Sequence, residues 1–123
     1  VPVDKYGIVN VEALKKAITD QTILISVMYA NGEIGTIEPI KEIGEIAHEK
    51  GISFHVDAVA AEGQVPINVR DEHIDLLTLS SNDLYGPKGV GALYIKSGTR
   101  IQPTLIFRSG RSAGGKTGFR AHY

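Results

Sequence analysis

The feature that most restricts the fold is a strand pattern followed by a helix pattern and then by another strand pattern. Residues 22–29 form a mostly apolar run rich in β-branched side chains, which predicts a strand buried on both faces. Pro39 suits the first position of a helix, an apolar stripe follows it, and Gly51 suits the end of that helix. Residues 52–56 predict the next strand. This order favours an α/β fold with parallel strand pairing.

Further elements extend the pattern on both sides. Asn10 can cap a helix over residues 11–20, because its side-chain oxygen can accept a backbone N–H that the first turn leaves unpaired. Residues 74–80 and 89–95 predict a third and a fourth strand. The turn at residues 86–89 between them is short, so the fourth strand is expected to run antiparallel.

Length and composition narrow the class of protein. The 123 residues suit one domain, which we assign to residues 1–107, followed by a Gly-, Ser- and Arg-rich loop tail at residues 108–123. The 13 basic and 14 acidic residues nearly cancel, so neither nucleic-acid binding nor attraction to a membrane surface is implied. No apolar run approaches the roughly 20 residues of a membrane helix. The absence of cysteine fits a reducing compartment, so we expect a cytoplasmic protein.

Polar segments follow the first three predicted strands. Asn31-Gly32-Glu33 follows the first strand, Asp57-Ala58 the second, and Ser80 to Asp83 the third. In open parallel sheets, ligands bind beyond the carboxyl ends of the strands. The strand pattern alone therefore predicts a binding site where these three segments meet.

A longer motif contains the third segment. It reads Ser80-Ser81-Asn82-Asp83-Leu84-Tyr85-Gly86-Pro87-Lys88-Gly89. Together with His55-Val56-Asp57-Ala58, it resembles the core of the cysteine desulfurases, which are pyridoxal-phosphate (PLP) enzymes of the aminotransferase class V kind. The resemblance spans nearly the whole chain, and it implies part of the mostly parallel large domain of a fold-type-I PLP enzyme.

The resemblance also implies an activity and partners for the complete enzyme. The substrate would be L-cysteine, whose sulfur would pass to a protein cysteine and leave alanine, for iron–sulfur cluster assembly. The complete enzyme would be a homodimer, with an iron–sulfur scaffold protein as a candidate partner. The chain does not begin with Met, so we expect a fragment or a truncated copy of a longer enzyme. Missing sheet segments would then leave apolar edges exposed and the isolated chain weakly stable.

Several residues match the cofactor contacts of this family. The resemblance assigns Asp57 to the pyridine nitrogen, which must stay protonated for the ring to act as an electron sink. From spacing alone, an Asp here more often holds a strand-end turn. Ser80, Ser81 and Asn82 match phosphate contacts, with solvated turn residues as the alternative. Asn31 opens a loop that reads Asn-Asn-Glu-Ile-Gly in the family.

The chain departs from the family at chemically important positions. Asp83 stands where the family has its Schiff-base Lys, and a carboxylate cannot form an imine. Gly32 and Ala60 replace an Asn and a Gln that contact the cofactor ring, and the persulfide-carrying Cys is absent. Some family members, archaeal ones among them, carry the same Asn-Asp pair. A non-covalent PLP site is therefore one expectation, with an external amine or a partner's Lys supplying the imine.

Three other functions remain as alternatives. Residues 110–117 match the P-loop pattern Gly-x-x-x-x-Gly-Lys-Thr, and residues 104–107 could form the strand before it, but only six residues follow Thr117, so a chance match is favoured. His48, His55, Asp57 and His73 suggest a metal site, although a pair without a third ligand in register is usually structural. The third alternative is a degenerate core that only binds a partner.

Overall fold

The computed structural model describes residues 1–101 of the chain as two helices and four strands. The helices are α1 (Val11–Ala17) and α2 (Ile40–Glu49), and the strands are β1 (Leu24–Met28), β2 (Ser53–Asp57), β3 (Leu76–Ser80) and β4 (Gly91–Ile95). The predicted loop tail, the P-loop match and the short strand at residues 104–107 lie outside the described residues. The assignment of residues 1–107 to one domain stays a prediction.

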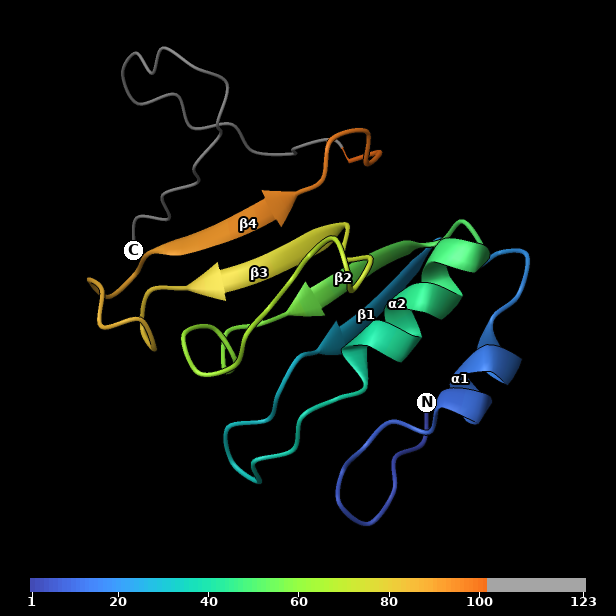
Figure 1. The fold of residues 1–123 in the computed structure, drawn as a ribbon, viewed down its shortest axis with the longest axis horizontal. Coiled ribbons are helices and arrows are strands. Elements are labelled where there is room, and N and C mark those ends of the chain that lie inside the picture. The colour runs from blue at the N-terminus through green and yellow to red at the C-terminus, as the bar shows by residue number, and fades with distance from the viewer. Residues whose placement is uncertain (102–123) are drawn as a thin grey trace.

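The four strands form one sheet in the order β1-β2-β3-β4 (Figure 1). β1 pairs with β2 and β2 pairs with β3 in parallel, and β4 runs antiparallel to β3. The α/β fold, the parallel pairing and the reversal at the fourth strand are therefore confirmed. A short connection can return the chain only beside the strand it has just left, which makes that pair antiparallel.

Helix α1 begins as predicted and ends early. The Asn10 side-chain oxygen accepts the backbone N–H of Ala13 at 2.9 Å. The prediction of a helix to residue 20 is wrong, because Ile18 already has extended backbone. Beyond it, the Thr22 hydroxyl accepts the N–H of Thr19 at 3.0 Å. Threonine side chains thus compete for backbone groups and favour a turn in place of another helical turn.

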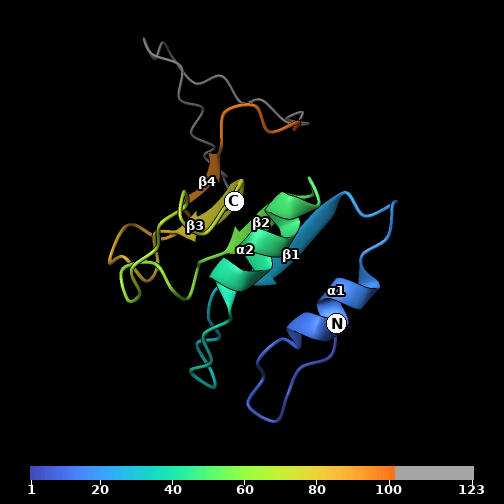
Figure 2. The ribbon, with the colours of Figure 1, turned by 45° about the vertical axis from the view of Figure 1, so that its right-hand side comes forward.

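Helix α2 covers one face of the sheet (Figure 2). Pro39 is the residue before the helix and not its first member, a shift of one position from the prediction. Gly51 follows the helix with a φ of +64°, a left-handed conformation that glycine adopts without strain. The buried face of α2 consists of Ile40, Ile43, Gly44, Ile46 and Ala47.

The core lies between α2 and the strands. Phe54 and Val56 of β2 are completely buried, as are Ile43 and Ala47 of α2. Full burial of a large apolar side chain contributes about 1.5–3 kcal/mol, so these residues stabilise the contact between helix and sheet. Helix α1 packs against α2 and lies beyond β1 (Figures 1 and 2). Neither described helix is long and apolar enough to cross a membrane.

The prediction that the first strand is buried on both faces is wrong. Ile25 is buried, but Leu24 and Met28 on the other face are 47% and 46% exposed. β1 is the edge strand of the described sheet, and the face opposite α2 carries no helix in the described part of the chain. β1 therefore carries more apolar side chains than the described residues bury.

Candidate functional site

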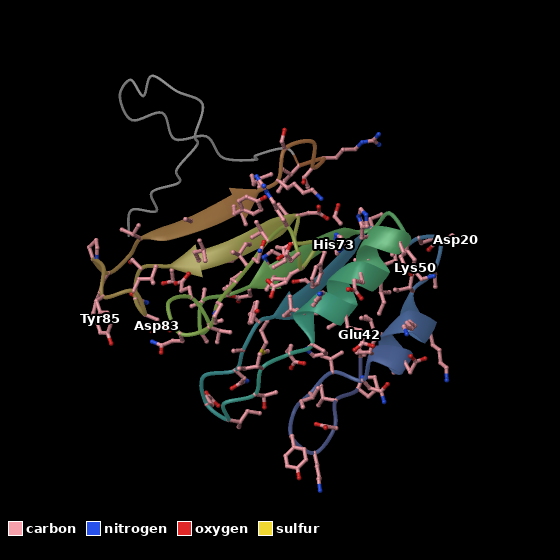
Figure 3. The ribbon with its side chains drawn as sticks, in the orientation of Figure 1. Asp20, Glu42, Lys50, His73, Asp83 and Tyr85 are labelled. Carbon is pink, nitrogen blue, oxygen red and sulfur yellow. The ribbon has the colours of Figure 1, made fainter. Side chains whose placement is uncertain are left out.

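The three predicted site segments meet at one end of the sheet. β1, β2 and β3 are parallel, so they all end on this side, which we call the carboxyl end of the sheet. Met28 is level with Asp57, and Asp57 is level with Thr78, two residues before Ser80. Asp83, just beyond β3, also lies at this end in Figure 3. Strand register thus brings the ends of β1, β2 and β3 side by side.

A cavity of about 390 Å³ opens between the segments that follow β1 and β2. Asn31, Gly32 and Asp57 line this cavity together, so the structure joins three of the predicted site residues. Its remaining lining residues are Met28, Ala30, Glu33, Val59 and Ala60. The other predicted residues, Ser80 to Asp83, lie beside it on the β3 side and do not line it.

Asp57 is exposed, and one of its two carboxylate oxygens accepts a hydrogen bond from the described residues. Its Oδ1 accepts the backbone N–H of Val59 at 3.1 Å, which holds the turn after β2. No residue of the described chain donates a hydrogen bond to its Oδ2. One oxygen thus fixes the orientation of the carboxylate, and the other can accept an N–H from a ligand.

The Asn31 side chain is occupied by its own loop. Its Oδ1 accepts the backbone N–H groups of Glu33 at 2.9 Å and Ile34 at 3.3 Å. Its amide nitrogen donates to the sulfur of Met28 at 3.7 Å. Asn31 therefore shapes one wall of the cavity through its oxygen, while the second N–H of its amide makes no hydrogen bond within residues 1–101 and can donate to a ligand.

Gly32 and Ala60 are neighbours in the wall of the cavity. A Cβ atom added to Gly32 would lie 3.7 Å from the Cβ of Ala60, which is ordinary van der Waals contact. Both positions depart from the pattern of the family that the sequence resembles. The structure shows that these two departures adjoin in the wall of the cavity that Asp57 also lines.

The start of the β3–β4 connection (residues 81–90) is held mainly by its own backbone. The Ser80 hydroxyl accepts the N–H of Asn82 at 3.2 Å. The Ser81 hydroxyl lies within hydrogen-bonding distance of the carbonyls of Pro87 and Val90. The side chains of Asn82 and Asp83 are exposed and make no hydrogen bond within residues 1–101. Among the predicted phosphate contacts, Asn82 is thus the one whose polar side chain makes no hydrogen bond within residues 1–101.

Sequence reasoning missed Glu62, which is 4% exposed. Its Oε1 accepts the backbone N–H of Ser80 at 2.7 Å, so it links the segment after β2 to the end of β3. A carboxylate directly after the small apolar residues 58–61 was the available signal, since a charged residue is rarely buried without a partner.

The histidines considered for a metal site lie in two different places. On the face opposite α2, the His55 ring bonds the Ser26 hydroxyl through Nδ1 at 2.7 Å and the Thr78 hydroxyl through Nε2 at 2.8 Å. His48 and His73 stack with ring centroids 4.5 Å apart. Residues 1–101 hold no group of three metal-ligating side chains. The hydroxyl contacts of His55 span β1, β2 and β3, and they lie on the same face as Asp57.

A family model described as "Aminotransferase class-V" matches residues 1–111 of the chain. The cysteine desulfurase IscS of Clostridium botulinum (strain Hall) is 62% identical over 114 residues, which are 93% of this chain and 28% of that protein. The chain therefore spans less than a third of the length of this relative.

Two solved structures are similar in fold and sequence. A protein described as "NIFS-like protein" superposes with a TM-score of 0.81 and 39% identity, covering 85% of this chain and 29% of that one. A protein described as "SspA in complex with cysteine" superposes with a TM-score of 0.78 and 38% identity, covering 81% and 29%. The described sheet and helices thus correspond to one part of larger proteins.

Proposed function

Because this chain belongs to the aminotransferase class-V family, we propose that it forms the PLP-facing core of a cysteine desulfurase-like protein. The observation that carries the proposal is the Asp57 carboxylate, which stands at the wall of a cavity with Oδ2 free of hydrogen bonds from the described residues. A carboxylate in this state suits a protonated ring nitrogen, because an N–H donor paired with a charged acceptor forms a strong hydrogen bond.

The residues around Asp57 fit the ring of PLP but not its covalent attachment. PLP, when bound, supplies an electron sink for an amine joined to it. Asp57 would keep the ring nitrogen protonated, and Val59 would keep the carboxylate in place through its N–H. Asp83 has no amine and cannot replace a Schiff-base Lys. We therefore propose non-covalent binding, with the amine supplied by the substrate or by another chain.

The phosphate side of the proposed site is the beginning of the β3–β4 connection. The exposed amide of Asn82 can donate hydrogen bonds to an anion. The Ser80 hydroxyl accepts the Asn82 N–H and retains its own hydrogen for donation. The Ser81 hydroxyl already faces two backbone carbonyls, which favours a role in shaping the connection. Asp83 would repel a phosphate, so we expect weaker binding than a Lys in its place would give.

The activity of the whole protein is a further proposal. The names of the relatives support L-cysteine as the substrate and sulfur transfer as the reaction. This chain has no cysteine to carry a persulfide, so that residue would come from elsewhere in a complete protein. A homodimer, an iron–sulfur scaffold partner and a cytoplasmic location follow from the same family reasoning and stay predictions.

The decisive experiment is a calorimetric titration of the chain with PLP, in parallel with an Asp57→Asn variant. The amide oxygen can still accept the Val59 N–H, but the charge opposite the ring nitrogen is lost. A hydrogen bond to a charged group contributes about 1.5–3 kcal/mol, so the Kd should rise at least about tenfold. Asp20→Asn, which changes an exposed Asp far from the site, is the matched control and should leave the Kd unchanged (Figure 3).

Surface lysines could also react with PLP, so the titrated samples should be reduced with borohydride and analysed by mass spectrometry. Non-covalent binding predicts that the cofactor is released and that no stoichiometric Lys adduct remains. Equal Kd values for Asp57→Asn and Asp20→Asn would refute the proposed role of Asp57.

A further inference from the structure

Glu62 is a buried carboxylate that joins the two halves of the candidate site. It lies in the turn segment after Asp57, where its backbone N–H donates to the carbonyl of Ala58 at 2.9 Å. Its side chain reaches across to β3, where Oε1 accepts the Ser80 N–H at 2.7 Å. One residue therefore contacts both the segment that carries Asp57 and the segment that leads to Asn82.

The other carboxylate oxygen of Glu62 lowers the stability of the folded chain. Oε2 is buried and has no hydrogen-bond partner among residues 1–101. A buried polar atom without a partner destabilises a protein, and an apolar side chain of similar size would avoid that cost. Packing alone therefore does not explain a carboxylate at position 62, whereas its hydrogen bond to Ser80 gives it a use.

The hydrogen bond to Ser80 lies where backbone pairing between the two segments ends. The Ala58 N–H donates to the carbonyl of Thr78 at 3.0 Å, and this is the last backbone bond between them in the described chain. On its other side, the start of the β3–β4 connection is tied to the end of the same connection, directly before β4, through the Ser81 N–H and the carbonyl of Val90 at 3.0 Å. Glu62 therefore supplies the link on the β2 side.

We propose that Glu62 is a positioning residue that sets the separation between the Asp57 carboxylate and the phosphate-side residues Ser80 and Asn82. This inference rests on the proposed function, because the separation matters only to a ligand that reaches both ends. Glu62 would favour ligands that carry both a protonated ring nitrogen and a phosphate. A ligand that reaches only Asp57 would not depend on it.

The test compares Glu62→Leu with Glu62→Gln in the full chain. Leucine fills similar space but cannot accept the Ser80 N–H, whereas glutamine retains a carbonyl oxygen for that bond. Glu42→Leu, which changes an exposed Glu on α2, is the control for the loss of a carboxylate (Figure 3). Loss of exchange protection at Phe54 in the core would show that the leucine variant is unfolded. In that case Glu62→Met, which has a more flexible side chain, replaces it in the comparison.

The first readout is amide hydrogen exchange, which requires no ligand. Loss of the acceptor should speed exchange at Ser80 by about tenfold or more and leave Phe54 protected. Glu62→Gln and Glu42→Leu should exchange at Ser80 at the rate of the unchanged chain. Unchanged Ser80 exchange in the leucine or methionine variant would overturn the inference.

The second readout compares PLP with pyridoxal, which has the ring nitrogen but no phosphate. If Glu62 sets the separation, the leucine variant should lose about tenfold in affinity for PLP and little for pyridoxal, and glutamine should restore the difference. An equal loss for both ligands would indicate general damage and overturn the inference. If the unchanged chain binds no PLP, the proposed function fails, and Ser80 exchange alone decides whether Glu62 positions the connection.

Discussion

At the scale of single residues, carboxylates hold together segments that are distant in the sequence. Glu38, which is 7% exposed, accepts the N–H of Val9 at 2.9 Å. Asp75 accepts the N–H of Phe54 at 3.0 Å, and Glu62 accepts that of Ser80 at 2.7 Å. Hydrogen bonds to charged groups are roughly twice as strong as neutral ones, so each of these contacts stabilises the packing of two segments that are far apart in the sequence.

Tyr29 also joins segments that are distant in the sequence, through its hydroxyl. It is 5% exposed, and its hydroxyl donates to Oε1 of Glu72 at 2.7 Å. Burial, and after it the hydrogen bond to Glu72, raises the pKa of Tyr29 to about 12. The folded state therefore holds the phenolic proton more tightly than the unfolded state, where the pKa is about 10.

This difference predicts a loss of stability at high pH. The contribution of Tyr29 is fully present below about pH 10 and declines as pH rises from about 10 to about 12. Tyr29→Phe should lower the free energy of unfolding by about 1–3 kcal/mol at pH 8. The deficit should shrink as the pH approaches 11, measured by urea denaturation. Tyr6→Phe, at an exposed position, is the control, and parallel pH profiles for Tyr29→Phe and the unchanged chain would contradict the prediction.

At the scale of elements, the contact between α2 and the segment before β3 depends on one small residue. A Cβ added to Gly44 would lie 2.0 Å from the backbone oxygen of Glu72 and 3.2 Å from Cε1 of Phe54. The helix can approach the backbone this closely only because Gly44 has no side chain.

Gly44→Ala should therefore destabilise the chain, although alanine is the better helix former. Overpacking against fixed backbone typically costs 1–3 kcal/mol, which exceeds the gain of roughly 1 kcal/mol from helix propensity. Because the approach to Glu72 is so close, the cost should lie toward the upper end of this range, which leaves a net loss of about 1–2 kcal/mol in the free energy of unfolding, measured by urea denaturation. Glu45→Ala, at an exposed position of the same helix, should change stability little. Comparable stability of the two variants would show that the backbone at Glu72 can move away.

At the scale of the whole molecule, none of the described residues 1–101 pairs with the outer edge of β1 or covers its second face with a helix. A groove of about 470 Å³ lies between β1, α1 and the N-terminal residues, all of which contribute to its lining. Its lining is largely apolar and includes Val9, Leu14 and Leu24. Exposed edge strands with apolar side chains can pair with other chains. This geometry agrees with a chain that spans less than a third of its relatives.

The isolated chain should consequently self-associate in a concentration-dependent way. Leu24→Lys places a charge on β1 and should shift the chain toward monomer, because edge lysines oppose strand pairing. Ile37→Lys is the matched control, since Ile37 is 52% exposed and Leu24 is 47% exposed. Sedimentation velocity over a range of concentrations measures the effect. If the unchanged chain stays monomeric at high concentration, the prediction is contradicted.

Much of the fold could be predicted from local patterns. The four strands, the antiparallel fourth strand and the Asn10 cap depend on residues that are near one another in the sequence, and the structure confirms them. The end of α1 was misjudged because the hydrogen bonds between Thr19 and Thr22 have no strong sequence signature. For the candidate site, the sequence identified the segments and their common end of the sheet, while the ligand roles of the individual residues stay predictions.

Local patterns were sufficient to predict the order of the elements, their pairing direction and the family, because periodicity, turn residues and motifs are properties of short segments. Three contacts came from the folded chain: Gly32 adjoins Ala60, Glu62 accepts the Ser80 N–H, and β1 is buried on one face alone. These contacts depend on strand register and on how closely α2 packs. Register and packing arise from the whole set of interactions at once, so no short segment specifies them.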